Sequence, residues 1–380
     1  MSSEHMVELP GTVRVRPAEQ TWEMLAEHLP DYGITRVADL TGLDSIGLPV
    51  WAAVRPASRT LSVSQGKGAT DTLARISAVM EAIELWHVEQ PLTVAAYGPA
   101  CDIPAACPVE VLPLRTRVDA KVLARVVWEW TTASGLVTGK KTLLPVDVVR
   151  RRVQRPEWSP DLLRATSTGL ACGNSRDEAL LHALLEVVER DVLYRDGQSG
   201  GRHRTMIDPL TVDDPYAHDL LDRLASAGME SEIALVEGPY GLPVCLAYLW
   251  SEDLPVVFAG GGCHTTAGIA LTRALSEAVQ SRLTLISGTR DDLPSEPALA
   301  DVPPSFRPEQ RTGLVPWTYA VGRWTPVGLA QQVTEIARRI QKVTGHEPAA
   351  LDLSDHSSPV HAVQVVAPGT RSRITRTMPR

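Results

Sequence analysis

Three segments of this 380-residue sequence repeat one pattern of small and acidic residues at helical spacing. Each segment has a central glutamate, an alanine seven and three positions before it, and an acid or amide three positions after it. These offsets fall on one face of an α-helix. The central residues are Glu81, Glu186 and Glu277, and the residues that follow them are Glu84, Glu189 and Gln280. The pattern predicts three helices, within residues 62–90, over about 177–194 and over about 269–287.

On a single helix this acidic stripe would fit a solvent-exposed face, because glutamate is a good helix former. An exposed face does not require alanine at two fixed offsets, so three matching helices indicate that the acids converge. Burying ionised carboxylates together costs roughly several kcal/mol for each ion unless a cation neutralises them. The helices carry no pair of His or Cys residues at ligand spacing, which favours a hard cation with oxygen ligands. Magnesium bound to a nucleotide fits this set.

A lysine between two glycines, in "SQGKG", precedes the first of these helices. We expect Lys67 to contact a phosphate group, with Gly66 and Gly68 allowing the backbone to come close to it. An ordinary turn would also explain the two glycines. The sequence contains no "GxxxxGK[ST]" motif, so the protein does not belong to the P-loop class.

Composition narrows the class of protein. An apolar fraction of 44%, a charged fraction of 22% and a formal net charge of -8 are typical of a soluble globular protein and give no attraction for nucleic acid. The sequence shows no signal-peptide pattern and no membrane-spanning stretch, so we expect a cytoplasmic protein. The five cysteines are odd in number and lack CxxC pairs, which argues against a disulfide framework and a structural zinc site.

Strand and helix patterns follow one another without a regular βαβ alternation, which predicts an α+β fold with mixed sheets. Strand patterns include residues 35–65, "KVLARVVWEWTT", "PVVFAGGGCHTT" and "VHAVQVVAPGT", and "PVGLAQQVTEIARRIQKVTG" is an amphipathic helix pattern. We expect a strand-rich N-terminal segment, residues 1–60, that forms one unit with residues 61–380. The stretch "RRRVQRPEWSP", residues 150–160, is predicted to be a flexible surface loop with solvated arginines.

The motifs on these helices resemble those of the YcaO family, which are ATP-dependent enzymes that modify peptide backbone amides. The similarity extends over nearly the whole chain and is most specific in "SAVMEAIE", "EVVERD" and "EAVQSR". It implies a YcaO-like fold with three acid-bearing helices around a nucleotide site, and makes residues 61–380 the catalytic domain. The chain departs from the family at Leu85 and Thr168, where arginine and asparagine are common.

The resemblance also implies roles for individual residues. The glutamates that hold magnesium would be Glu81, Glu186 and Glu277. The residues that bind ATP would be Lys67, Ser77, Glu84, Glu189 and Gln280. The catalytic residues, Arg190 and Arg282, would neutralise charge. The family chemistry requires no enzyme nucleophile, so Cys172 and Cys263 are expected to be packing residues and His264 a structural histidine.

In the implied reaction a nucleophile attacks an amide carbonyl, the oxyanion takes the γ-phosphoryl group of ATP, and phosphate then leaves. A Cys, Ser or Thr side chain gives an azoline, an amine gives an amidine, and external sulfide gives a thioamide. No region of the sequence resembles the fused peptide-clamp domain or the proline-rich tail of azoline-forming relatives, so we expect modification of one or a few amides. Ring formation ranks above thioamide formation, which would need a sulfide-delivering partner.

The expected partners are a precursor peptide, a separate leader-binding or sulfur-delivery protein, and a second copy of the chain in a homodimer. Two other classes of function stay open at this point. A non-catalytic scaffold would bind a partner enzyme or the peptide without ATP, although an inactive copy would be expected to lose its acids. A magnesium-dependent hydrolase would work without nucleotide. Binding of ATP would separate these possibilities.

Overall fold

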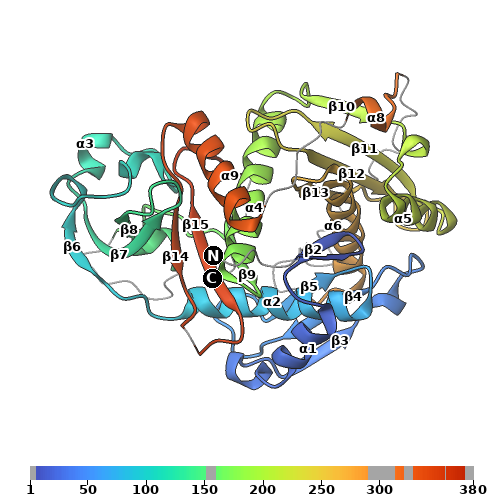
Figure 1. The fold of residues 1–380 in the computed structure, drawn as a ribbon, viewed down its shortest axis with the longest axis horizontal. Helices are drawn as coiled ribbons and strands as arrows, with labels where there is room; N and C mark the ends of the chain where they lie inside the picture. The colour runs from blue at the N-terminus through green and yellow to red at the C-terminus, as the bar shows by residue number, and fades with distance from the viewer. Residues whose placement is uncertain (1–5, 151–159, 290–312, 321–327, 356, 373–380) are drawn as a thin grey trace.

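The computed structural model describes residues 6–150, 160–289, 313–320, 328–355 and 357–372. The named strands pair in antiparallel fashion within separate sheets, and helices lie between and against these sheets (Figure 1). The α+β fold predicted from the sequence is therefore confirmed, whereas the sheets formed by the named strands are antiparallel and not mixed as predicted. Nearly all of the predicted surface loop at residues 150–160 lies outside the described residues.

The described strands form one hairpin and three larger sheets. The hairpin consists of β1 (Val7–Leu9) and β2 (Thr12–Arg14), and the three-stranded sheet of β3 (Arg36–Asp39), β4 (Val50–Val54) and β5 (Val63–Lys67). The six-stranded sheet contains β6 (Ala96–Pro99), β7 (Val127–Gly135), β8 (Lys141–Pro145), β9 (Leu170–Gly173), β14 (Ala349–Asp352) and β15 (His361–Val366). The four-stranded sheet contains β10 (Arg204–Ile207), β11 (Glu230–Val236), β12 (Val244–Trp250) and β13 (Phe258–Cys263).

Three long helices lie where these sheets meet (Figure 1). They are α2 (Asp71–Glu89), α4 (Arg176–Gln198) and α6 (Ala267–Ser287), and they match the three helices that the repeat predicts. The other described α-helices are α1 (Ala18–Ala26), α3 (Ala120–Leu123), α5 (Pro215–Ser226), α8 (Trp317–Ala320) and α9 (Leu329–Thr344). No helix in the described ranges has both the length and the apolar character needed to cross a membrane.

Each acidic helix follows a strand at the end of a sheet: β5 precedes α2, β9 precedes α4 and β13 precedes α6. The helix then folds back onto that strand at very short range. A Cβ atom added to Gly66 of β5 would lie 1.9 Å from the backbone nitrogen of Ala78, and one added to Gly262 of β13 would lie 2.0 Å from the carbonyl oxygen of Ala270. Only glycine allows this approach.

The same packing explains the alanine stripe. The alanines seven and three positions before each central glutamate are all completely buried: Ala74, Ala78, Ala179, Ala183, Ala270 and Ala274. A larger side chain there would hold the helix away from its strand. This packing gives Gly66 a role other than the predicted approach to a phosphate, because the backbone of α2 fills the space where a side chain would lie.

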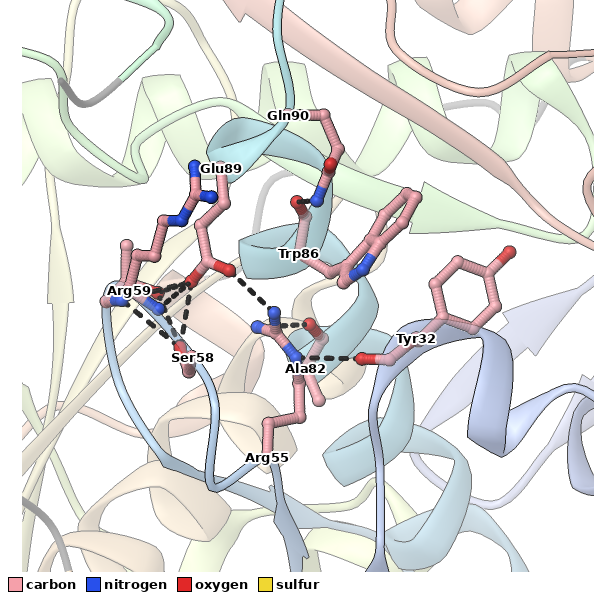
Figure 2. A network of polar contacts seen from close by, with 9 residues as sticks. Tyr32, Arg55, Ser58, Arg59, Ala82, Trp86, Glu89 and Gln90 are labelled. Carbon is pink, nitrogen blue, oxygen red and sulfur yellow. Dashed lines mark hydrogen bonds and ion pairs between the residues drawn. The ribbon is translucent and has the colours of Figure 1, made fainter. Parts of the chain in front are cut away.

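The C-terminal end of α2 is fixed by a buried ion pair (Figure 2). Arg55, which follows β4, donates to the carboxylate of Glu89 at 2.7 Å and to the carbonyl oxygens of Tyr32 and Ala82 at 3.0 and 3.2 Å. The other oxygen of Glu89 accepts the backbone N–H of Thr60 at 3.0 Å. These contacts tie the β4–β5 loop to the helix, and so tie the strand that carries Lys67 to the helix that carries Glu81.

The residues before and after position 60 share one sheet, since β4 pairs with β5 along five residue pairs. The N-terminal hairpin connects the first 60 residues to the rest of the chain at a second place. The backbone N–H of Val15, just after β2, donates to Glu178 in the first turn of α4 at 2.8 Å. At the hairpin turn, Gly11 lies against the ring of Tyr216 on α5.

Candidate active site

A cavity of about 710 Å³ lies between α2, α4 and α6 and is bordered by β5 and the β1–β2 hairpin. Its volume is within the range of small-molecule and cofactor sites. All the predicted site residues except Arg282 line it: Lys67, Ser77, Glu81, Glu84, Glu186, Glu189, Arg190, Glu277 and Gln280. The convergence predicted from the three matching helices is therefore present in the structure.

Backbone N–H groups of the strands hold three of the carboxylates. Glu84 accepts the N–H of Cys172 at 2.7 Å, Glu186 accepts that of Gly169 at 3.1 Å, and Glu277 accepts that of Gly261 at 3.1 Å. Cys172 and Gly261 belong to β9 and β13, and Gly169 directly precedes β9. Each of these carboxylates thus has one oxygen fixed by a strand, which orients the side chain at the cavity wall.

Arg190 lies among the carboxylates of two helices. Its Nε atom is 3.6 Å from an oxygen of Glu186 and 3.6 Å from an oxygen of Glu189, and one terminal nitrogen is 3.7 Å from an oxygen of Glu277. On Glu186 and Glu277 the oxygen that faces Arg190 is Oε1, whereas Oε2 accepts the backbone N–H. The guanidinium group therefore neutralises the cavity side of the cluster.

The electrostatics of the cluster disfavour full ionisation. Burial raises the pKa of Glu186 to about 7, although the charge of Arg190 and the N–H of Gly169 oppose the shift. Burial also raises the pKa of Glu84 well above its usual value, and the nearby charges of Glu81 and Glu186 add to this effect. The pKa of Glu189 is raised by burial as well, with Arg190 opposing. More positive charge at the site would favour the ionised forms.

The donor set fits a magnesium ion in kind, because the acidic helices offer carboxylate and amide oxygens to the cavity. Within the described part of the chain, however, no three His, Cys, Asp or Glu side chains already converge closely enough to hold one ion. The assignment of Glu81, Glu186 and Glu277 as its ligands stays a prediction. Arg190 lies near the Oε1 atoms of two of these three residues, Glu186 and Glu277.

Lys67, at the end of β5, connects the strand to α6. Its ammonium group donates to the amide oxygen of Gln280 at 2.8 Å, and the amide nitrogen of Gln280 donates to the backbone carbonyl of Gln65. Lys67 and Gln280 are thus held together at the cavity wall, where a lysine provides a positive charge for a phosphate group.

Arg282 is a correction to the sequence analysis. Its side chain is 2% exposed and does not line the cavity. It donates to Asp44 at 2.9 Å, to Ser251 at 2.8 Å and to Asp253 at 2.7 Å. Arg282 therefore ties α6 to two loops, and these contacts explain its position without a catalytic role.

Several polar residues of the cavity were not predicted: Arg14, Arg16, Asn174, Glu178, His182 and Arg273. The repeat contains a signal for two of them. Ser77, His182 and Arg273 stand four positions before the three central glutamates, one helical turn away on the same face. Burial lowers the pKa of His182 well below its usual value, and the charge of Arg273 acts in the same direction, so this imidazole is neutral. Arg14 and Arg16 carry no such periodic signal.

The cysteines and the histidine that were expected to be structural are buried. Burial raises the thiol pKa of Cys172 and of Cys263 well above the usual value, which makes both poor nucleophiles. His264 does not line the cavity, and its Nδ1 atom accepts the backbone N–H of Thr266 at 3.0 Å, just before α6. These observations support the structural interpretation.

A family model described as "YcaO cyclodehydratase, ATP- and Mg²⁺-binding" matches residues 65–371. This chain belongs to the YcaO family. The description gives the family's cofactors as ATP and Mg²⁺, as the sequence predicts. An uncharacterised protein of Mycobacterium tuberculosis H37Rv is 37% identical over 370 residues, which cover 94% of this chain and 82% of the relative.

The fold is also similar to solved structures. YcaO from Methanopyrus kandleri, bound with AMPPCP and Mg²⁺, matches with a TM-score of 0.76 and 22% identity over 98% of this chain and 97% of that chain. A heterocyclase in complex with substrate and cofactor matches with a TM-score of 0.71 and 19% identity, over 97% of this chain and 55% of that chain. The YcaO-like fold expected from the motifs is therefore confirmed.

Proposed function

We propose that this protein uses ATP and Mg²⁺ to activate a backbone amide of a ribosomally made peptide, followed by loss of water to form an azoline or amidine ring. The observation that carries the proposal is the convergence of acids from three helices, together with Arg190 and Lys67, in one cavity of suitable size for a nucleotide. The family description, ATP- and Mg²⁺-binding cyclodehydratase, supports both the cofactors and the loss of water.

The charge of each cavity residue indicates its role in this reaction. Lys67 and Arg273 line the cavity and provide positive charge for the phosphates. Glu81, Glu186 and Glu277 would hold Mg²⁺, and Glu84, Glu189, Ser77 and Gln280 would complete the nucleotide site. Bound Mg²⁺ supplies neutralisation of phosphate charge and orientation of the γ-phosphoryl group. Arg190 would neutralise the charge that develops during transfer.

The proposed reaction balances without a covalent enzyme intermediate. A nucleophile of the peptide adds to the amide carbon, the carbonyl oxygen takes the γ-phosphoryl group and ADP is released. The nucleophile gives up its proton as it adds. The former carbonyl C–O bond then breaks as the amide nitrogen forms a C=N bond and loses its proton, and inorganic phosphate leaves with the former carbonyl oxygen. The enzyme needs to position the two reactants and stabilise charge.

A peptide-binding partner protein, a homodimer and a cytoplasmic location belong to the same proposal. The homodimer rests on the family resemblance alone. The partner protein rests on the lack of a region that resembles a fused peptide clamp, and the cytoplasmic location on the lack of a signal-peptide pattern and a membrane-spanning stretch in the sequence. The heterocyclase that shares the fold is described in complex with its substrate. That similarity supports a bound substrate for this chain as well, and the peptide nature of this substrate rests on the family resemblance.

The proposal is tested by replacing one carboxylate. Glu186→Gln keeps the size of the side chain but removes a metal ligand that the N–H of Gly169 orients, so it should abolish peptide-dependent ATP turnover and leave the fold intact. Turnover is measured as phosphate release, and the fold by circular dichroism. Wild-type turnover in the folded variant would contradict the assignment of Glu186.

Mass spectrometry of the cognate peptide, incubated with enzyme, ATP and Mg²⁺, identifies the product. Loss of one water supports ring formation. Exchange of one oxygen for sulfur, seen only with added sulfide, would replace ring formation by thioamide formation and keep the ATP-dependent activation. If the protein does not bind AMPPCP with Mg²⁺, the non-catalytic scaffold is the better explanation.

A further inference from the structure

Arg190 contacts three carboxylates at nearly equal distances, and all three distances are long. Its nitrogens lie 3.6–3.7 Å from oxygens of Glu186, Glu189 and Glu277. Hydrogen bonds between a charged N–H group and a carboxylate are about 2.7–2.9 Å long, so none of these contacts is a tight one. The Arg190 side chain is 34% exposed and borders the open cavity. The side chain is therefore in a position from which it can move.

Two of the carboxylates around Arg190 are held by the backbone through the oxygen that does not face the guanidinium group. The Oε2 atoms of Glu186 and Glu277 accept backbone N–H groups, and their Oε1 atoms face the guanidinium group. A magnesium ion requires oxygen ligands at about 2.0–2.1 Å. The oxygens available to such an ion on these two residues are the ones that Arg190 now neutralises. Arg190 and a metal would therefore compete for the same oxygens.

We propose that Arg190 is a resident counterion of the metal site, which Mg²⁺ displaces from the carboxylates when it binds. This inference rests on the proposed function, because it assumes that these acids hold the metal. In the metal-free protein Arg190 pairs with the carboxylates. Once a metal has replaced it there, Arg190 pairs with the negative charge of the phosphates. The exchange keeps the cluster neutralised at each stage, which avoids a buried group of unpaired carboxylates.

The inference predicts that Arg190 competes with a metal for the same oxygens. In the nucleotide-free protein, Mn²⁺ can replace Mg²⁺ as a paramagnetic probe, and free Mn²⁺ is measured by electron paramagnetic resonance. Arg190→Gln removes the competing charge and should tighten Mn²⁺ binding by about threefold to tenfold, the range given by an ion pair worth about 0.7–1.4 kcal/mol. Arg190→Lys keeps the charge on a shorter side chain that cannot span the three carboxylates, so its affinity should fall between the two.

Lys67→Gln is the matched control, because it removes a positive charge from the same cavity without removing a guanidinium group from among the acids. Its Mn²⁺ affinity should rise by less than that of Arg190→Gln, since Lys67 donates to Gln280 and affects Glu189 only through its charge. Circular dichroism establishes that each variant is folded. If Arg190→Gln does not fold, Arg190→Lys carries the comparison alone and must bind Mn²⁺ more tightly than the wild type.

Three outcomes would overturn the exchange: folded Arg190→Gln that binds Mn²⁺ no more tightly than wild type, an equal gain in Lys67→Gln, or no Mn²⁺ binding in any variant. Failure of the proposed function gives a different result. In that case the wild-type protein does not bind AMPPCP in the presence of Mg²⁺, whatever the Mn²⁺ affinities of the nucleotide-free variants.

Discussion

At the scale of single residues, Arg190 and Arg282 show how much one helical position matters. Both arginines follow a central glutamate, but Arg190 stands four positions after Glu186 (190 − 186 = 4) and Arg282 five after Glu277 (282 − 277 = 5). Residues four apart share a helix face, whereas residues five apart do not. Arg190 accordingly faces the cavity and Arg282 faces Asp44 and Ser251. The spacing alone would have excluded Arg282 from the site.

A second residue-scale feature is His87, which lies on α2 beyond the acidic stripe. Its ring centre is 5.0 Å from that of Trp86 and 6.0 Å from that of Tyr32. Burial lowers the pKa of His87 to about 4, and the charge of Arg55 adds to the shift, while the backbone of Leu353 and the charge of Asp355 oppose it. The folded protein therefore holds a neutral imidazole.

This burial makes stability depend on pH in a defined direction. An unfolded chain takes up a proton at His87 near pH 6.5, whereas the folded chain does so only near pH 4. The contribution is complete above pH 6.5 and is lost as the pH falls toward 4, up to about 3 kcal/mol of unfolding free energy. His87→Gln should lose less stability over this range than the wild type, measured by urea unfolding at each pH. His361→Gln, at an exposed position, is the control, and equal pH profiles for His87→Gln and the wild type would contradict the prediction.

At the scale of elements, the helices could be predicted well and the sheets less so. The second and third acidic helices were expected over about 177–194 and 269–287, and they extend over Arg176–Gln198 and Ala267–Ser287. Periodicity within one segment is sufficient to locate a helix. The position of β14 and β15 between β7 and β9 depends on contacts between distant segments, which no local pattern records. For the same reason, the hairpin at the edge of the cavity was not foreseen.

The close packing of strand on helix gives a prediction at this scale. Gly262→Ala would place a Cβ atom 2.0 Å from the carbonyl oxygen of Ala270 and 2.8 Å from the nitrogen of Ala274, so α6 would have to move away from β13. The free energy of unfolding should fall by at least about 2 kcal/mol, as measured by chemical denaturation. Gly42→Ala, where nothing lies within 4 Å of the added Cβ atom, should change it by less than about 0.5 kcal/mol. A similar small change for both variants would show that the packing is not as tight as described.

At the scale of the whole molecule, the cavity belongs to no single sheet. The three acidic helices follow end strands of the three larger sheets, and each helix contributes to the wall. The N-terminal hairpin closes one border and is tied to α4 through Val15 and Glu178. Because β9 and β13 supply or adjoin the N–H groups that orient three of the acids, and β5 carries Lys67, the shape of the site depends on how all three strand–helix units sit together.

A ligand that binds to all three units should therefore stabilise all of them at once. At a concentration 100 times its dissociation constant, AMPPCP with Mg²⁺ should add about 2.7 kcal/mol to the free energy of unfolding. Hydrogen–deuterium exchange should show slower exchange in α2, α4, α6 and the β1–β2 hairpin together, while β6 and α3, which do not line the cavity, change little. The effect should be weaker with EDTA in place of Mg²⁺ and weaker again in Glu186→Gln. Protection confined to one of the three helices would mean that the nucleotide does not contact all three strand–helix units, and would contradict the prediction.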